Sequence, residues 1–264
     1  PWHLFIIFGI FIGIGLSTHD VATLSTIAHW FPKRRGFITA IVKIGTAFGQ
    51  IMLPLIAAFL ILKFDWRLST IIIGLTAACL LFLSAFLVKL PKSLNLKDRT
   101  RPIDGIFFNI ASKSPTFKKL CAIQFLYFPT LMTIPTHIAV HGTDLGMTQT
   151  KAAFLLSAIG AASIVGRLSV GIFLDKMGGK KSYLFCFIPI LLSLLIFIFV
   201  TNHTILFLFV ALYGFAHGAL FVVVSPTIAE YFGLRDHASL FGIVVFCGTI
   251  GGAIGPIFPG SVFD

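Results

Sequence analysis

The chain carries eight apolar segments of about twenty residues or more, separated mostly by short polar connections. A bilayer core about 30 Å thick requires roughly 20 apolar residues per helix. Within that core every backbone N–H and C=O must be bonded inside its own segment, which favours helices. Only 11% of the residues are charged, whereas a soluble domain carries about 25%. We therefore expect an all-α integral membrane protein with helical spans near residues 3–30, 37–62, 67–89, 117–141, 151–174, 182–201, 204–230 and 237–260.

The distribution of Lys and Arg predicts how the chain sits in the membrane. Of the 20 Lys and Arg residues, only Lys63, Arg67 and Lys151 fall in connections on one side, and Lys43 and Arg167 fall inside spans. Loops rich in Lys and Arg face the cytoplasm, so we expect the opposite, basic side to be cytoplasmic. This topology accounts for the net charge of +11 without any nucleic acid. The expected partner is the lipid bilayer of a plasma or inner membrane.

A polar, basic and Pro-containing segment divides the spans into two groups. Residues 28–54 and 229–256 also resemble each other, because both place an aromatic pair before basic residues and then Gly-Thr, Gly and Pro at nearly the same spacing. Such internal repeats are common in transporters. We expect the end of one helical half at residues 1–89, a cytoplasmic linker at 90–116 and a second half at 117–264.

Charged residues inside the spans mark the candidate site, because a charge in hydrocarbon is costly unless it pairs or faces water. Arg167 and Lys43 each lie well inside a span, and Asp20 lies near the middle of the first span. The two cations favour an anion, and a planar guanidinium suits a carboxylate because it binds two oxygens at once. Structural alternatives stay open: Arg167 paired with Asp20, Lys43 reaching the cytoplasmic surface, and Asp20 hydrogen-bonded locally rather than carrying a proton.

Histidines add further candidates. His217 is a candidate substrate contact, with a packed, hydrogen-bonded histidine as the alternative. His19, beside Asp20, and His137 are candidates for coupling or charge balance. His137 and His141 have a metal-ligand spacing on a helix, but one pair does not make a site, so we expect neither a metal nor a cofactor. The sequence contains no HExxH or GxSxG pattern, so an intramembrane enzyme is only the runner-up class.

Residues 166–181, GRLSVGIFLDKMGGKK, resemble the signature of the major facilitator superfamily, with Gly179 as one additional glycine. More narrowly, the chain resembles the monocarboxylate transporter family in WFPKRRGFITAIVKIGTAFG (30–49), FDWR (64–67), HGTDLGMTQTKAAFLLSAIG (141–160) and GPIFPGSVFD (255–264). The resemblance implies a helical bundle of that superfamily, built from two pseudo-repeated halves. It also implies that the eight spans are helices four to eleven of twelve, so that the chain is an internal piece of a longer protein.

The same resemblance implies roles for individual residues. In the family, the arginine at the position of Arg167 binds the substrate carboxylate. An aspartate linked to proton coupling is replaced here by Ser163, and an aromatic residue that narrows the substrate site is replaced by His217. We also expect a charge latch between helices on the cytoplasmic face, formed by a gating motif that comprises Gly166, Gly171, Asp175, Lys176, Gly178, Lys180 and Lys181.

Taken together, the residues and the resemblance predict secondary active transport of a small organic anion by alternating access. The first candidate substrate is a monocarboxylate. Arg167 holds the carboxylate, Lys43 adds positive charge, and Asp20 or a histidine balances charge or carries a proton as coupling ion. Two alternatives stay open. One is a carrier of the same superfamily for another anion or a neutral solute, and the other is a membrane sensor of the same fold that transports nothing.

Overall fold

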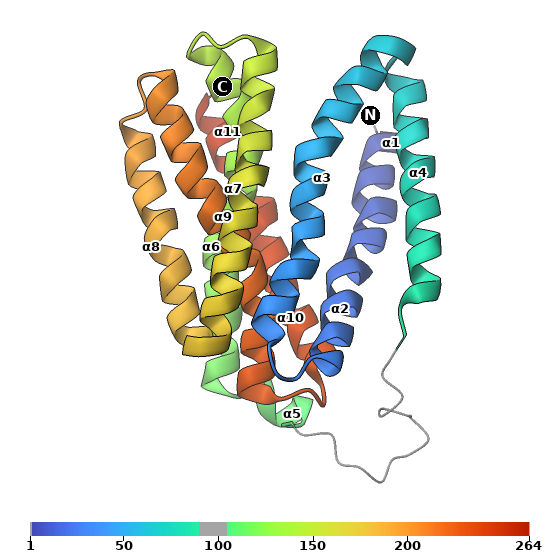
Figure 1. Cartoon of the computed structure of the whole chain (residues 1–264), viewed down its shortest axis with the longest axis vertical. Coiled ribbons are helices and arrows are strands. Elements are labelled where there is room, and N and C mark those ends of the chain that lie inside the picture. The colour runs from blue at the N-terminus through green and yellow to red at the C-terminus, as the bar shows by residue number, and fades with distance from the viewer. Residues whose placement is uncertain (1, 90–104, 264) are drawn as a thin grey trace.

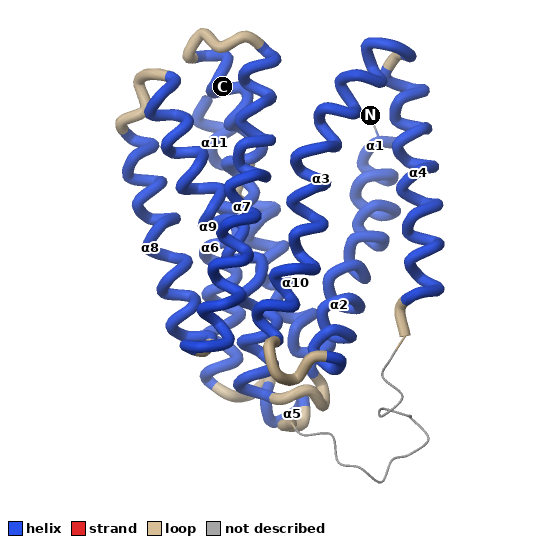
Figure 2. Tube along the Cα trace, in the orientation of Figure 1, coloured by secondary structure: helices blue, strands red, loops and turns tan. Residues whose placement is uncertain are grey.

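The computed structural model describes residues 2–89 and 105–263, and within these ranges it contains helices and no β-strand, only one isolated bridge. Figure 1 shows long helices that run roughly along a common axis. The loops of Figure 2 are short and lie at the two ends of the bundle. The all-α bundle expected from the apolar segments is therefore confirmed.

The first group of helices contains three membrane-length spans. The first span is one helical run in three parts, where α1 (Trp2–Phe5) passes through the π-helical η1 (Ile6–Ile12) into α2 (Gly13–Trp30). α3 (Arg35–Phe64) and α4 (Trp66–Leu87) follow. A corner at Asp65, where φ is 77°, joins α3 to α4. The Asp65 carboxylate stabilises this corner because it accepts a hydrogen bond from the N–H of Arg67 at 3.3 Å.

The second group is more tightly packed around α9, which is the most buried helix of the described chain. A Cβ atom on Gly166 of α7 would overlap the carbonyl oxygen of Phe215 on α9, and one on Gly218 of α9 would overlap that of Ser163 on α7. Small residues therefore set the close spacing of α7 and α9. The group comprises α5 (Phe108–Ala111), α6 (Pro115–Asp144), α7 (Gln149–Met177), α8 (Gly179–Ile198), α9 (His203–Phe232), α10 (His237–Ile254) and α11 (Ile257–Phe263).

Within the described residues, seven helices are long and apolar enough to cross a membrane. The remaining expected span, 117–141, is present as α6, a helix of 30 residues. It is not among the seven because polar side chains such as Lys118, Gln124 and His137 are spread along it. Seven of the eight expected spans are therefore strongly apolar helices of membrane length, and the remaining one is a more polar helix of 30 residues.

The two groups meet along α3 and α7, which lie side by side at one end of the bundle (Figure 1). A Cβ atom on Gly171 would lie 2.7 Å from the Cβ of Ala40, and one on Gly160 would lie 2.9 Å from Cγ1 of Ile51. Beyond Pro54, α3 loses this contact, and its Leu62 is 90% exposed. The groups therefore touch near the N-terminus of α3 and diverge toward its C-terminus.

The described part of the expected linker packs on the second group. Gly105 forms a bridge with Gly233, and the N–H of Ile106 donates to the carbonyl of Phe232 at 2.9 Å. The N–H of Phe108 donates to Asp236 at 2.7 Å. Hence residues 105–114 belong structurally with α9 and α10, whereas residues 90–104 of the expected linker lie outside the described residues.

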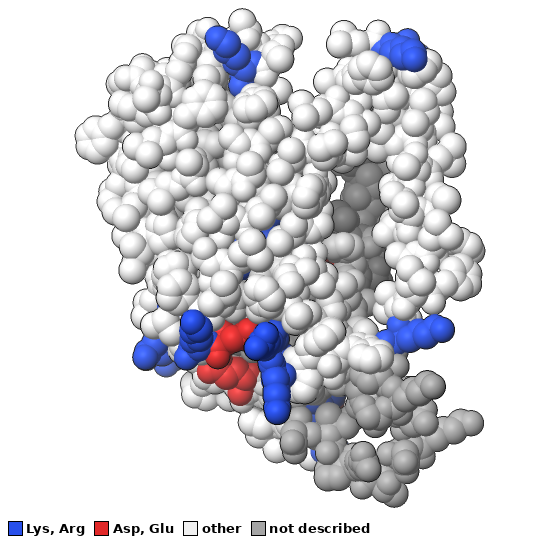
Figure 3. Space-filling view, in the orientation of Figure 1, with Lys and Arg blue, Asp and Glu red and all other residues white. Residues whose placement is uncertain are grey.

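Charged side chains and exposed apolar side chains lie at different levels along the long axis of the bundle. Figure 3 shows most Lys and Arg side chains at one end, few at the other, and a broad band between them with almost none. We call the first of these the basic end; the N-terminus of α3 and the C-terminus of α7 meet there. Large side chains such as Leu75 and Ile198, 67% and 73% exposed, lie on long apolar helices. Such faces require lipid, so the protein is a multi-pass integral membrane protein.

Candidate functional site

Arg167 lies in the second half of α7 and is only 1% exposed. Its Nη1 donates to Oγ of Ser163 at 2.6 Å, and that hydroxyl donates to the carbonyl of Gly160 at 2.6 Å. Its Nε is buried without a hydrogen-bond partner. Among the described residues, no carboxylate lies within 4.0 Å of the guanidinium. A buried cation with an open donor and no counter-charge is a strong site for an anion.

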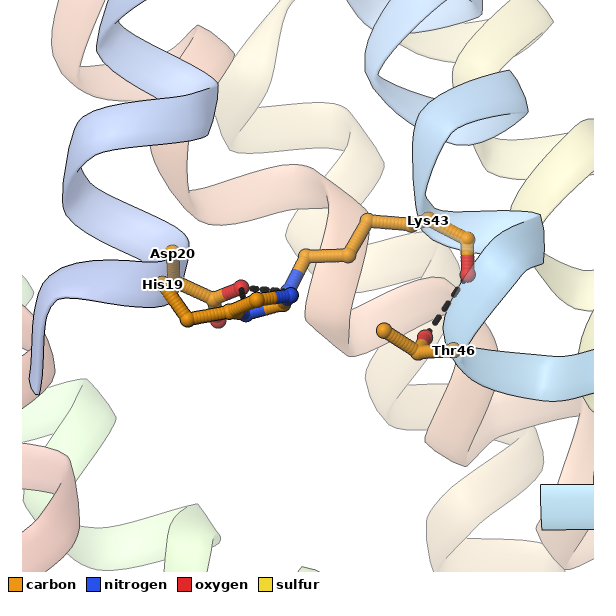
Figure 4. A network of polar contacts seen from close by, with 4 residues as sticks. All are labelled: His19, Asp20, Lys43 and Thr46. Carbon is orange, nitrogen blue, oxygen red and sulfur yellow. Dashed lines mark hydrogen bonds and ion pairs between the residues drawn. The ribbon is translucent and has the colours of Figure 1, made fainter. Parts of the chain in front are cut away.

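Lys43 is the second buried cation and, unlike Arg167, it has a carboxylate partner. The side chain is 5% exposed, and its Nζ donates to Oδ1 of Asp20 at 2.6 Å. Nδ1 of His19 lies 3.0 Å from the same oxygen. Figure 4 shows His19 and Asp20 of α2 pointing toward Lys43 of α3, with Thr46 bonded to the Lys43 carbonyl. The pair therefore links α2 to α3 in the interior of the bundle.

A cavity of about 280 Å³ lies beside this ion pair. Polar atoms reach it from both helices, through His19 and Asp20 of α2 and through Lys43 and Thr46 of α3. Because Asp20 retains 30% side-chain exposure, the pair is accessible from this cavity. The cavity is large enough for a small solute or for several water molecules.

A column of rings on α9 connects the lysine to the arginine side of the site. The ring centroids of Tyr213 and His217 are 5.6 Å apart, and those of His217 and Phe221 are 5.0 Å apart. Nζ of Lys43 lies 5.6 Å from the Phe221 centroid, a cation–π contact. Arg167 lies one helical turn from Gly171, and Lys43 lies one turn from Ala40, which packs against Gly171 across the α3–α7 contact. Residues from α2, α3, α7 and α9 thus form one charged cluster between the two helix groups.

Two structural alternatives from the sequence are wrong. Arg167 does not pair with Asp20, because α2 packs on α3 and brings Asp20 to Lys43 instead. Lys43 does not reach the surface, because the same ion pair and the Phe221 ring hold it inside. The structure brings His217 into the cluster but not His137, whose Nε2 lies 3.2 Å from the carbonyl of Pro256 at the α10–α11 junction.

The gating motif forms an inter-helix contact of a different kind from the expected charge latch. The Asp175 carboxylate accepts hydrogen bonds from the N–H groups of Gly36 and Phe37 at 2.8 and 3.0 Å. It therefore caps the N-terminus of α3, where the helix dipole favours negative charge. In the described part of the chain, no ion pair within 4.0 Å involves the basic residues of the gating motif, which are Lys176, Lys180 and Lys181.

The turn that follows α7 explains two glycines of the motif. Gly178 has a φ of 78°, which favours glycine. The N–H of Gly179 donates to Oε2 of Glu230 on α9 at 2.7 Å, and a Cβ atom on Gly179 would lie within 3.0 Å of the Thr227 side chain. The additional glycine of this chain is therefore where α8 begins against α9. Glu230 was missed by the sequence reasoning, although its place at the end of an apolar span was a usable signal.

Ser163 and Phe221 are the site residues whose contacts the sequence did not predict. Ser163 precedes Arg167 by one helical turn, so the i, i+4 spacing was a signal for their contact. Phe221 follows His217 at the same spacing. Its contact with Lys43 of another helix depends on the packing of α3 against α9, which the sequence does not encode locally.

Comparison with known proteins gives a consistent result. The family model of the Major Facilitator Superfamily matches residues 1–256. Monocarboxylate transporter 7 of Homo sapiens is 25% identical over an alignment of 331 residues, and this alignment covers 99% of this chain and 63% of that protein. The MFS transporter asaE of Aspergillus flavus is 25% identical, over 97% of this chain and 58% of that protein.

A third relative has a different named substrate. The riboflavin transporter MCH5 of Saccharomyces cerevisiae is 28% identical over all of this chain and 54% of that protein. The chain thus spans between 54% and 63% of the length of these three relatives.

Proposed function

Because the chain belongs to the major facilitator superfamily, we propose that it serves secondary active transport of a small organic anion, with a monocarboxylate as the first candidate. The observation that carries this proposal is the state of Arg167. Its guanidinium is buried, has an unpartnered Nε and has no carboxylate within 4.0 Å among the described residues. A solute carboxylate supplies the missing charge and accepts two hydrogen bonds in one plane.

The other residues of the cluster have supporting roles in this proposal. Lys43 contributes positive charge near the anion, and the carboxylate of Asp20 offsets that charge. His217 presents a buried Nδ1 without a hydrogen-bond partner, which suits a second polar group of the solute. Asp20 and His19 face the cavity on α2, so they are the candidates for carrying a coupling proton.

The arrangement of the helices supports alternating access as the mechanism. Arg167 is closed off from solvent in this conformation, so a solute reaches it only when the helix groups move. We propose that residues 1–89 and 117–264 rock against each other, as repeated halves do in secondary transporters. The Asp175 contact closes the basic end, which we assign to the cytoplasmic side of a plasma or inner membrane.

Counterflow in liposomes tests this proposal with the full-length protein that contains the chain. Radiolabelled lactate, pyruvate and acetate serve as probes, and Arg167→Ala is compared with Lys151→Ala, which removes an exposed Lys at the opposite end. Arg167→Ala should lower lactate counterflow at least tenfold at equal membrane insertion, because a buried charge contact contributes about 2 kcal/mol or more. Lys151→Ala should transport normally. Equal counterflow by both variants contradicts the role of Arg167, and no counterflow in the wild type favours a sensor.

A neutral planar solute is the second candidate, because the rings of Tyr213, His217 and Phe221 form a continuous column at the site. This candidate has support from the relative that is named a riboflavin transporter. Riboflavin counterflow that survives Arg167→Ala would select it over the anion.

A further inference from the structure

We propose that Asp20 is a specificity-determining residue, which restricts the anion site to solutes that carry a single negative charge. This inference rests on the proposed anion transport and adds to it a charge rule. The observation behind it is that the buried cluster contains two cations but only one of them is neutralised. A site that holds one uncompensated positive charge is matched by a monoanion.

The other carboxylates of the described chain lie away from the cluster, at or next to helix ends. Asp175 caps α3, Glu230 caps α8, and Asp236 binds the N–H of Phe108. Asp65 caps α4, and Asp144 is the last residue of α6. Asp20 is therefore the only described carboxylate within the cluster that contains Lys43 and Arg167.

The geometry shows which cation is offset. Asp20 Oδ1 lies 2.6 Å from Nζ of Lys43, whose side chain is 5% exposed. Among the described side chains, Arg167 donates only to the neutral hydroxyl of Ser163. The charge of Lys43 is thus compensated within the protein, and that of Arg167 is left for the solute.

This balance disfavours a solute with two negative charges. A monoanion on Arg167 makes the cluster neutral, whereas a dianion leaves one negative charge without a partner in a site of low dielectric constant. At distances of about 10 Å and an effective dielectric constant of about 20, one charge changes affinity about tenfold or more. Asp20→Asn should reverse the preference, because it frees Lys43 to act on the second negative charge.

Competition binding to the purified full-length protein tests the rule, at a pH where both carboxyls of malonate are ionised. Lactate is the monoanionic probe and malonate the dianionic probe. The wild type should prefer lactate, and Asp20→Asn should shift the lactate-to-malonate affinity ratio at least tenfold toward malonate. Asp20→Glu should behave as the wild type. The double variant Asp20→Asn/Lys43→Met should return to lactate, because its net charge is again that of the wild type.

The double variant separates this rule from a role of Asp20 in proton transfer alone. If the double variant keeps the ratio of Asp20→Asn, or if Asp20→Asn weakens both anions equally, Asp20 does not select by charge. A wild type that prefers malonate also overturns the rule while leaving an anion site at Arg167 intact. A wild type that binds neither probe overturns both the rule and the proposed function. Asp20→Ser provides the same charge change if the Asn variant does not fold.

Discussion

Two buried cations of this chain lie on α3 and α7, the helices through which its two groups pack, and only one of them has a carboxylate partner among the described residues. Lys43 has Asp20, whereas Arg167 has only a serine hydroxyl among its described side-chain partners. Burying an uncompensated guanidinium destabilises a protein by several kcal/mol. This cost is the physical basis for the proposal that a ligand neutralises Arg167.

Ser163 should position Arg167 for that ligand. Ser163→Ala removes the acceptor for Nη1 and leaves the guanidinium freer to turn away. Because a hydrogen bond to a charged group contributes about 1.5 kcal/mol or more, lactate affinity should fall about tenfold in a binding assay. Ser163→Thr keeps the hydroxyl and should stay within about threefold of the wild type. Equal affinities for the Ala and Thr variants would argue that the hydroxyl is not needed.

At the residue scale, the sequence located the charged residues inside the spans, but it did not predict their partners. Charge inside apolar segments identified Arg167, Lys43 and Asp20 without any structure, because such residues are expensive in a membrane. The pairing of Asp20 with Lys43 rather than Arg167 depends on the relative rotation of α2 and α3. No short-range pattern encodes that rotation, so the partner was not predictable.

At the scale of helices, glycines decide how closely α7 approaches its neighbours. Gly166→Ala places a methyl group against the backbone of Phe215, and the two helices must separate to accept it. Overpacking of this kind typically destabilises by about 1–3 kcal/mol. The thermal unfolding midpoint of the purified protein should therefore fall by several degrees. Gly242→Ala on α10 is the matched control, since its added Cβ would meet only Val21 at 3.9 Å; equal midpoints would refute the tight α7–α9 contact.

The Asp175 cap should hold α3 and α7 together at the basic end. Asp175→Asn removes the negative charge at the α3 N-terminus, and because an amide has one acceptor oxygen it keeps only one of the two hydrogen bonds. The two losses together should cost about 1 kcal/mol. The closed population should then fall about fivefold relative to the open one. Spin labels at Lys33→Cys and Lys181→Cys, in a cysteine-depleted background, report this as a larger fraction of long distances. An unchanged distance distribution would show that the cap does not set the equilibrium.

The positions of the helices were more predictable than their details. Apolar length and the glycines near Gly178 located the spans and most of their ends to within a few residues. The exception is the span expected at 237–260, which ends at Ile254 and is followed by the separate helix α11. The π-helical part of the first span was not predicted either. The capping of α3 by Asp175 was not predictable because it joins segments 138 and 139 residues apart in the chain. The sequence pattern thus located the gating motif. The structure shows that its Asp175 accepts hydrogen bonds from backbone amides of α3.

At the scale of the whole molecule, the helices form two groups that touch at the basic end and diverge at the other (Figure 1). The sequence predicts two halves, residues 1–89 and 117–264, from the basic segment between them and from the repeat, and this division stays a prediction. It did not predict which end is closed, because closure depends on the packing of Gly36 and Ala40 against Gly171. The asymmetry of charge in Figure 3 gives the bundle a direction in the membrane.

Labelling of single cysteines tests that direction in intact cells. An impermeant maleimide should react with Lys63→Cys, at the C-terminal end of α3, without permeabilisation. Lys180→Cys, at the start of α8, should react only after permeabilisation. The reverse pattern would place the basic end outside and contradict the assigned topology.

The most direct measurement is equilibrium binding of radiolabelled lactate to the purified full-length protein, with Arg167 as the only variable. The wild type should bind about one lactate per protein, Arg167→Lys should bind more weakly because it lacks the planar fork, and Arg167→Ala should lose at least about 30-fold in affinity. Binding by Arg167→Ala that equals that of the wild type would contradict a carboxylate site at this buried guanidinium.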